Sequence, residues 1–372
     1  MAAAGLLAAL GWFGYPRWVQ RQHDQAYEAC FDAQTGKRWR ELERLATEWS
    51  KWEPHSADPW IFRADAVQQQ GNFVAAATFL GSVPEADPKY LLAQLRLAAL
   101  QFGPMNRPLE GAVTCEQILK REPRSFEAHR HLIEFYAVTL QREKLLRAID
   151  EAIRVSSEPL VAYIYLLLID TMRVGNATEL NRLWLEAAPG TEMFLVAEAV
   201  QMPEPEGGIA NSTDKHQIIE TMLERFPANL ELRAYLVDLA IRRGDINELV
   251  EVLQGVSNGA DRDARFWRAK GWLHLNRNEP EKARAALEQA LKFNPLDWDA
   301  RNWLADLTRN AGNLAEADRL QGLVRQARKL REKIRETSFD QLPRETFTEI
   351  ADYARACGAT TIADALQRRV NN

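Results

Sequence analysis

Residues 57–90, with the sequence ADPWIFRADAVQQQGNFVAAATFLGSVPEADPKY, carry the pattern that decides the fold. Within this stretch Trp60 is followed by Ala64 four residues later, by Gly71 eleven residues later and by Pro88 twenty-eight residues later. Spacing of this kind indicates a repeated unit when a second copy occurs in the same chain.

A second copy occupies residues 264–297, with the sequence ARFWRAKGWLHLNRNEPEKARAALEQALKFNPLD. Trp267 is followed by Gly271 four residues later and by Pro295 twenty-eight residues later, which are the offsets found in the first copy. Ala283 lies sixteen residues after this tryptophan, as Ala76 lies sixteen residues after Trp60. The two stretches therefore share one template.

Each place in the template has a physical reason in a helix–turn–helix unit. The small residue, Ala64 or Gly271, lets the two helices of the unit approach closely. Gly71 ends the first helix, because glycine adopts a positive φ at little cost. The proline, Pro88 or Pro295, stops the second helix and begins the turn to the next unit.

This template resembles the tetratricopeptide repeat, a helix–turn–helix unit that stacks into arrays. The resemblance implies an all-α fold, a right-handed superhelical solenoid whose first helices line a concave groove. It also implies a scaffold or adaptor that binds proteins or peptides in that groove. Bacterial proteins with one N-terminal span before a tetratricopeptide array, which serve envelope assembly or quality control, are similar in organisation.

The repeat frame extends along the chain and predicts its organisation, with about nine units that follow the helical spacing. The predicted segments are an apolar N-terminal segment (1–22), an N-terminal array (23–200), a degenerate repeat with a Pro/Gly-rich loop (201–229), a C-terminal array ending in an extended charged helix (230–336) and a truncated terminal helix pair (337–372).

The N-terminal segment suggests a membrane anchor. Residues 2–15 contain no charged side chain. The apolar run approaches the length of about 20 residues that spans a bilayer only when it is extended to Val19, which includes Arg17. We expect a single-pass N-terminal anchor and membrane association through residues 2–19. A cleaved signal peptide and a capping helix of the array are alternatives, and the membrane side of the repeats stays open.

No motif for catalysis or metal binding interrupts the repeats. The sequence lacks a phosphate-binding glycine loop, a G-x-S-x-G elbow and an H-E-x-x-H motif. The cysteines, Cys30, Cys115 and Cys357, form no C-x-x-C pair. The formal net charge of −5 lacks the basic excess of typical nucleic-acid binders. We therefore expect no enzymatic activity, no cofactor or metal, and no nucleic-acid partner.

The groove-facing places lie opposite the small residue that meets the second helix. In the unit from residue 230 these places hold Glu231, Ala234, Asp238, Ile241 and Arg242. In the next two units the candidate partner-binding residues are Arg265, Arg268, Trp272, Asn276, Asn302 and Arg309. Arginine can hold a carboxylate with two hydrogen bonds, and asparagine can pair with a peptide backbone. Chaperone-binding members of the family need asparagine where this chain has Trp272.

Two other functions stay open. One is a helical-repeat nucleic-acid binder, which a basic concave face would favour. The other is an enzyme with its site in the groove, which a buried polar pocket would favour.

Overall fold

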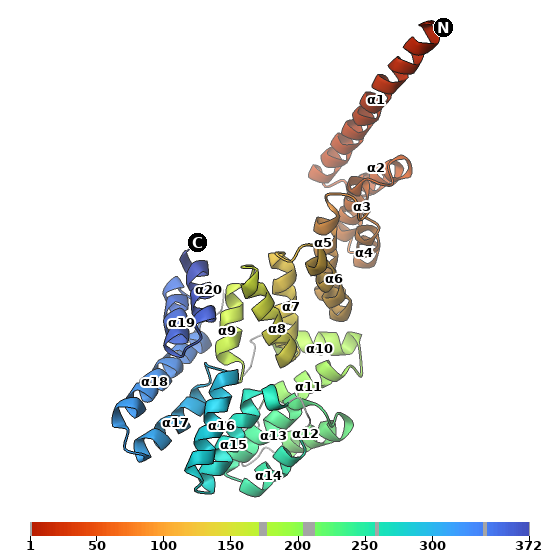
Figure 1. Cartoon of the computed structure of the whole chain (residues 1–372). Coiled ribbons are helices and arrows are strands. Elements are labelled where there is room, and N and C mark those ends of the chain that lie inside the picture. Colours follow the sequence, from red (N-terminus) through yellow and green to blue (C-terminus); the bar gives the residue numbers. More distant parts are fainter. Residues whose placement is uncertain (1, 171–176, 204–212, 257–259, 338–340, 372) are drawn as a thin grey trace. The chain divides into compact units, whose positions relative to one another are not determined.

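A computed structural model describes residues 2–170, 177–203, 213–256, 260–337 and 341–371, with side chains described from Trp18 onward except at 213 and 214. These residues form α-helices joined by short turns, with a 3₁₀ turn at Ala260–Arg262 and no strand (Figure 1). The expected all-α class is confirmed. The chain divides into two compact units, Met1–Ala128 and His129–Asn372, and each is described by itself.

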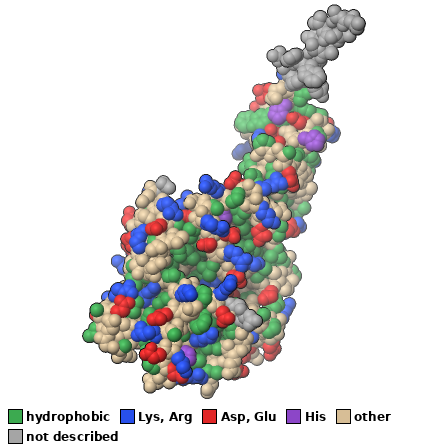
Figure 2. Space-filling view, viewed as in Figure 1, with side chains coloured by type: hydrophobic (Ala, Val, Ile, Leu, Met, Phe, Trp, Pro, Cys, Tyr) green, Lys and Arg blue, Asp and Glu red, His purple; other side chains and the backbone are tan. Residues whose placement is uncertain are grey.

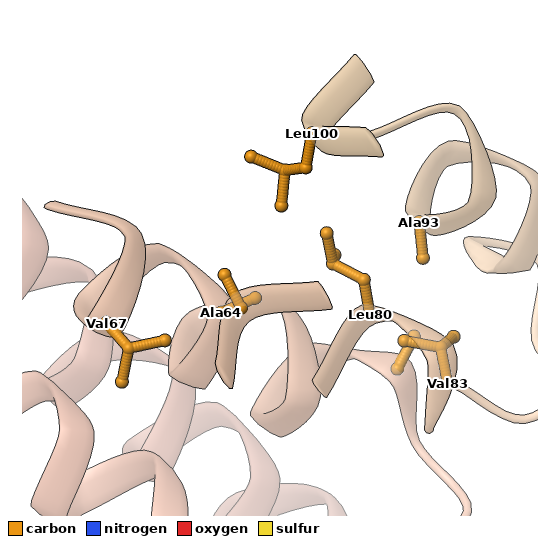
Figure 3. Packing of buried hydrophobic residues seen from close by; sticks show 8 residues of the cluster. Ala64, Val67, Leu80, Val83, Ala93 and Leu100 are labelled. Carbon is orange, nitrogen blue, oxygen red and sulfur yellow. The ribbon is translucent and has the colours of Figure 1, made fainter. Parts of the chain in front are cut away.

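The first unit is built from helix pairs in which each helix contacts the next along the chain. The pairs are α1 (Ala2–Thr35) with α2 (Trp39–Trp52), α3 (Ala57–Gln69) with α4 (Phe73–Gly81), and α5 (Tyr90–Phe102) with α6 (Pro108–Arg121). Figure 3 shows Ala64 of α3, Leu80 of α4, and Ala93 and Leu100 of α5 gathered in one buried cluster. The core therefore passes from one pair to the next, as expected of stacked units.

The second unit begins within α7. Its helices, in the order of the chain, are α7 (Phe126–Val138), α8 (Arg142–Arg154), α9 (Leu160–Leu168), α10 (Ala177–Ala187), α11 (Glu192–Gln201), α12 (Thr213–Arg225), α13 (Leu230–Arg243), α14 (Ile246–Gln254), α15 (Ala264–Asn276), α16 (Pro280–Phe293), α17 (Trp298–Asn310), α18 (Leu314–Glu336), α19 (Arg344–Ala356) and α20 (Thr360–Asn371). From α10 onward each helix contacts the next along the chain.

The second unit also returns on itself. Helix α9 contacts both α18 and α20, and Figure 1 shows α9 beside α20. Arg369 Nε on α20 donates a hydrogen bond of 3.2 Å to the backbone oxygen of Glu158, which lies just before α9 and 211 positions earlier in the chain. Helices that are distant in sequence therefore meet within the second unit.

The template residues play their predicted roles. Gly71 has a φ of +81°, in the turn between α3 and α4. Asn278 stands at the equivalent turn after α15 and has a φ of +58°, which asparagine tolerates better than most residues. A Cβ atom on Gly271 would lie 2.6 Å from Leu287 Cδ2, so α15 and α16 pack too closely for a larger side chain.

The degenerate repeat, residues 201–229, contains α12, and α11 lies just before it. Its Pro/Gly-rich loop lies, from Glu204 onward, outside the described residues. The charged helix in this part of the chain is α18, which runs from Leu314 to Glu336. The segment boundaries at 22, 200, 229 and 336 remain predictions about how the chain is organised.

The expected membrane anchor is wrong. Helix α1 runs from Ala2 to Thr35 and is long, but no helix in the described part of the chain is both long and apolar enough to cross a bilayer. Glycine, tyrosine, proline and arginine lower the hydropathy of its apolar run, and the helix continues unbroken into charged residues. Near its end, Cys30 and Ala33 are fully buried in a cluster with Leu42 and Trp49.

Candidate functional site

Two of the candidate groove residues, Arg265 and Arg268, line a cavity in the second unit. Its volume is about 310 Å³, and we call it the smaller cavity. Both lie on α15, three positions apart, and therefore on one face of that helix. The other lining residues come from α8, α11, α12, α13 and the chain around α9: Leu140, Arg142, Ile169, Asp170, Val200, Lys215, Glu231, Ala234, Tyr235, Asp238 and Arg242.

Arg265 is held by carboxylates on both sides. Its Nη1 and Nη2 atoms donate to Glu231 Oε2 and Oε1 at 2.6 and 2.8 Å, a two-pronged contact between α15 and α13. Nη2 also donates to Asp263 Oδ2 at 2.7 Å. Burial alone would raise the pKa of Asp263, but the guanidinium groups of Arg265 and Arg142 hold that pKa well below its usual value. These charges are therefore ionised and fixed in place at neutral pH.

Arg268 reaches carboxylates from two other elements. Its Nη1 atom lies 3.0 Å from Asp297 Oδ2 and 3.5 Å from Asp170 Oδ2. Asp170 also lies 3.0 Å from Arg142 Nη2, on α8, and accepts a hydrogen bond of 2.9 Å from Asn294 Nδ2, just after α16. One carboxylate therefore joins α8, α15 and the turn between α16 and α17.

Charged side chains dominate the walls of the smaller cavity. The cations in its lining are Arg142, Lys215, Arg242, Arg265 and Arg268, and the carboxylates are Asp170, Glu231 and Asp238. Asp263, Asp297 and Asp299 meet the same arginines from outside the lining. Ion pairs this deeply buried add little net stability, but removing one partner costs about 3–5 kcal/mol because the other charge stays buried. The network therefore specifies one arrangement of these helices.

A larger cavity of about 810 Å³ adjoins the smaller one. The two share Leu140, Arg142 and Glu231 in their walls. The larger cavity combines apolar and polar side chains from α8, α11 and the first residue of α13, and from the turns before α8, α13 and α15. These residues are Thr139, Gln141, Glu143, Lys144, Leu146, Glu192, Met193, Val196, Ala228, Asn229, Leu230, Arg262 and Asp263. A space with this lining suits an amphipathic ligand.

The remaining candidate residues line neither cavity. Trp272 is half-buried against the core between α13 and α15, and Asn276 Nδ2 donates back to the Trp272 oxygen at 2.9 Å. Asn302 Oδ1 accepts a hydrogen bond from Gln321 on α18. Arg309 is exposed and pairs with Asp306 and Asp318 at 3.6 and 3.3 Å. The structure therefore brings Arg265 and Arg268 together and leaves the other four apart.

The smaller cavity is also lined by four residues of α13 that helical geometry places toward the groove: Glu231, Ala234, Asp238 and Arg242. Sequence reasoning missed Arg142 and Asp170. Arg142 begins α8, a second helix of its pair, and Asp170 follows the end of α9, so neither occupies a groove-facing place of the template. Their role depends on contacts between distant units, for which the sequence carries no local signal.

Comparison with known proteins agrees with the repeat pattern. Residues 260–328 match the tetratricopeptide repeat family. No curated protein matches the chain.

Similar solved structures include a tetratricopeptide repeat protein from Parabacteroides merdae ATCC 43184, which is 16% identical and has a TM-score of 0.33, with 68% of this chain and 98% of that one covered. The yeast Tom70 is 14% identical, with 98% of this chain and 96% of that one covered and a TM-score of 0.32. The Cut9–Hcn1 complex of the APC/C is 14% identical, with coverages of 93% and 71% and a TM-score of 0.33. Likeness at this level carries no argument about function.

Proposed function

This chain is a tetratricopeptide-repeat protein, and on that premise we propose that it acts as an interaction scaffold for a partner protein. The bound part of the partner is an extended peptide segment, and the larger cavity of the second unit receives it. Repeat arrays commonly present such inner surfaces to extended ligands.

The observation that carries this proposal is the shape and lining of the larger cavity. Its volume of about 810 Å³ lies within the usual range for ligand sites, roughly 300–1,000 Å³, and suits a few residues of an extended chain rather than a folded domain. Leu146, Met193 and Leu230 offer apolar contacts. Gln141 and Asn229 add amide groups to the walls, where Gln141 donates to Thr139 and Asn229 donates to Glu192.

The test uses a variant that fills the larger cavity from an exposed turn. Ala228 is exposed, lines that cavity and lies in the turn between α12 and α13, so Ala228→Trp adds bulk without entering the core. Ala311 is an exposed alanine in the turn between α17 and α18 and lines neither cavity, so Ala311→Trp is the matched control. We expect affinity capture with the wild type and the control to recover the same partner, and the filled variant to lose it.

Recovery of the same partner by Ala228→Trp would place the binding surface elsewhere and contradict the proposal. A circular dichroism melt of each variant checks that the fold is intact. The partner's binding segment is then mapped with overlapping synthetic peptides against the wild type and both variants.

The smaller cavity favours a second candidate, an enzyme with its site in the groove, because it is polar and buried. Its described lining offers no serine, cysteine or histidine, and each of its carboxylates is paired with an arginine: Asp170 with Arg142 and Arg268, Glu231 with Arg265, and Asp238 with Arg242. Charged groups committed in this way suit binding better than acid–base catalysis.

A nucleic-acid partner finds no comparable support. Figure 2 shows Lys and Arg side chains interspersed with Asp and Glu over the visible face, without a broad basic area. A polyanion would need a continuous basic surface to follow its backbone.

A further inference from the structure

Arg142 has hydrogen-bonding capacity that the protein does not use. Its side chain is only 8% exposed and lies in the walls of both cavities. Nη2 faces Asp170 at 3.0 Å and Nε faces Asp263 at 3.4 Å, but Nη1 has no hydrogen-bond partner. A buried guanidinium donor left without an acceptor is costly, and such groups mark places where a ligand or a rearrangement supplies one.

Asp170 is the carboxylate that faces this arginine, and it already occupies the position of a bound anion. Arg142, Arg268 and Asn294 approach it from three separate elements, at 3.0, 3.5 and 2.9 Å. A guanidinium pair together with an amide donor is the set of groups that recognises a carboxylate or a phosphate.

The other carboxylates of the network each have a second structural task. Asp263 and Asp297 accept backbone N–H groups at the starts of α15 and α17. Glu231 is held by both terminal nitrogens of Arg265, and Asp238 pairs with Arg242 one turn along the same helix. Asp170 follows the end of α9, and the contacts described for its carboxylate are with the side chains of Arg142, Arg268 and Asn294.

We propose that the smaller cavity binds an anionic group, a carboxylate or a phosphate, and that Asp170 is the resident counter-ion which this group displaces. The inference rests on the proposed function, in which a bound peptide segment can bring a carboxylate into this cavity; a free anion offers the same chemistry. Displacement follows from the geometry: Asp170 lies against both Arg142 and Arg268, so an incoming anion faces both guanidinium groups only when this carboxylate leaves.

The volume of about 310 Å³ admits a small ion or the end of a peptide. Asp170 therefore sets the affinity of the site, because every incoming anion competes with it for Arg142 and Arg268. A weaker resident counter-ion gives tighter binding.

The test measures binding of acetate and of inorganic phosphate to the full chain by calorimetry, with chloride keeping the ionic strength constant. Asp170→Asn keeps the shape of the residue and removes its charge. We expect this variant to bind both anions at least about tenfold more tightly than the wild type does. Asp238→Asn is the control, since it removes another carboxylate of the same lining. The affinity of Asp238→Asn for acetate and phosphate should equal that of the wild type.

Equal affinity of wild type and Asp170→Asn overturns the proposal, and so does an equal gain in Asp238→Asn, which would mark a general charge effect. If Asp170→Asn fails to fold, Arg142→Gln replaces it. That variant removes the guanidinium that carries the unused donor, so it should bind both anions at least about tenfold more weakly than the wild type does. An unchanged affinity in Arg142→Gln then overturns the proposal.

Separate outcomes distinguish this inference from the scaffold proposal. A partner that is captured by the wild type, lost in Ala228→Trp and bound equally by Asp170→Asn supports the scaffold and overturns the displacement of Asp170. Tighter binding of acetate and phosphate by Asp170→Asn, with no partner captured by any variant, supports the anion site and contradicts the scaffold. A preference for phosphate over acetate identifies a free phosphate or phosphorylated ligand, and the reverse identifies a carboxylate.

Discussion

The side-chain amide of Asn294 donates a hydrogen bond of 2.9 Å to Oδ2 of Asp170, although the two residues are 124 positions apart in the chain. Asn294 follows α16, and Asp170 follows α9. Oδ1 of the same asparagine accepts from the backbone N–H of Leu296 at 3.1 Å. One side chain therefore stabilises a local turn and ties two distant parts of the second unit together.

Replacing Asn294 with alanine should lower the free energy of unfolding by about 1–3 kcal/mol, because buried Asp170 loses a donor and the Leu296 N–H loses an acceptor. Urea unfolding followed by circular dichroism measures the change. Asn310→Ala, at an exposed position at the end of α17, is the control and should change the stability by less than about 0.5 kcal/mol. Equal effects of the two substitutions would show that the tie to Asp170 contributes nothing.

Gly271 should not tolerate alanine. The added Cβ would lie 2.6 Å from Leu287 Cδ2 and 2.7 Å from Cγ, and Leu287 is fully buried. We expect a net loss of about 1–3 kcal/mol from overpacking, even though alanine favours helix. Gly322→Ala in α18 is the matched control, since the added Cβ would have ample room, with Arg325 Nη2 at 3.9 Å. That substitution should stabilise the protein by about 0.5–1 kcal/mol, through helix propensity alone.

Trp49 anchors the docking of α1 in the first unit. It is 1% exposed, contacts the rings of His23, Tyr27 and Phe62, and donates from Nε1 to Glu53 Oε2 at 2.6 Å. Trp49→Ala should cost about 3–5 kcal/mol, because it leaves a large cavity beside α1. Trp52 stacks on Trp49 but is 47% exposed. Trp52→Ala should therefore lower the free energy of unfolding by only about 1 kcal/mol. Thermal melts of the two variants compare these losses, and similar values would mean that α1 does not depend on Trp49.

Asp299 should make stability fall as the pH rises from about 4 to about 6. Burial raises the pKa of Asp299 to about 6 from an ordinary value of 3.8; Arg268 opposes this rise and Asp297 adds to it. The folded protein therefore holds the proton more tightly than the unfolded chain does. The resulting stabilisation is fully present below pH 4 and is lost as the pH passes 6. The pKa of Asp263 is lowered, so this group has the opposite effect: its contribution to stability is lost as the pH falls below the ordinary range of an aspartate.

Asp299→Asn should flatten the dependence of unfolding free energy on pH between about 4 and 6, which urea titrations across that range measure. Asp306→Asn, on the exposed face of α17, should leave the dependence as in the wild type. An unaltered slope in Asp299→Asn would show that this carboxyl group titrates normally.

The fold could be predicted from the sequence because each helix–turn–helix unit is specified by residues close together in the chain. Trp60, Ala64 and Gly71 define one helix–turn–helix unit through local packing and a turn with positive φ. The same spacing repeats at Trp267, and stacking of neighbouring units then follows. The expected membrane anchor was wrong because length without enough apolar character does not define a spanning helix.

The candidate site could be predicted only in part. Helical face geometry places Arg265 and Arg268 together, since a helix brings residues three positions apart onto one side. It could not place Asn302 or Arg309 away from the cavities, because that depends on how α17 and α18 pack.

The sequence by itself therefore determined the repeat, the helix pairs and the direction in which α13 and α15 present their charged residues. Only the tertiary structure decided that the second unit closes on itself, so that Asp170 meets Arg142, Arg268 and Asn294. The reason is physical: spacing along a helix specifies contacts over one or two turns, whereas the small rotation between successive units accumulates over the array and has no local signature.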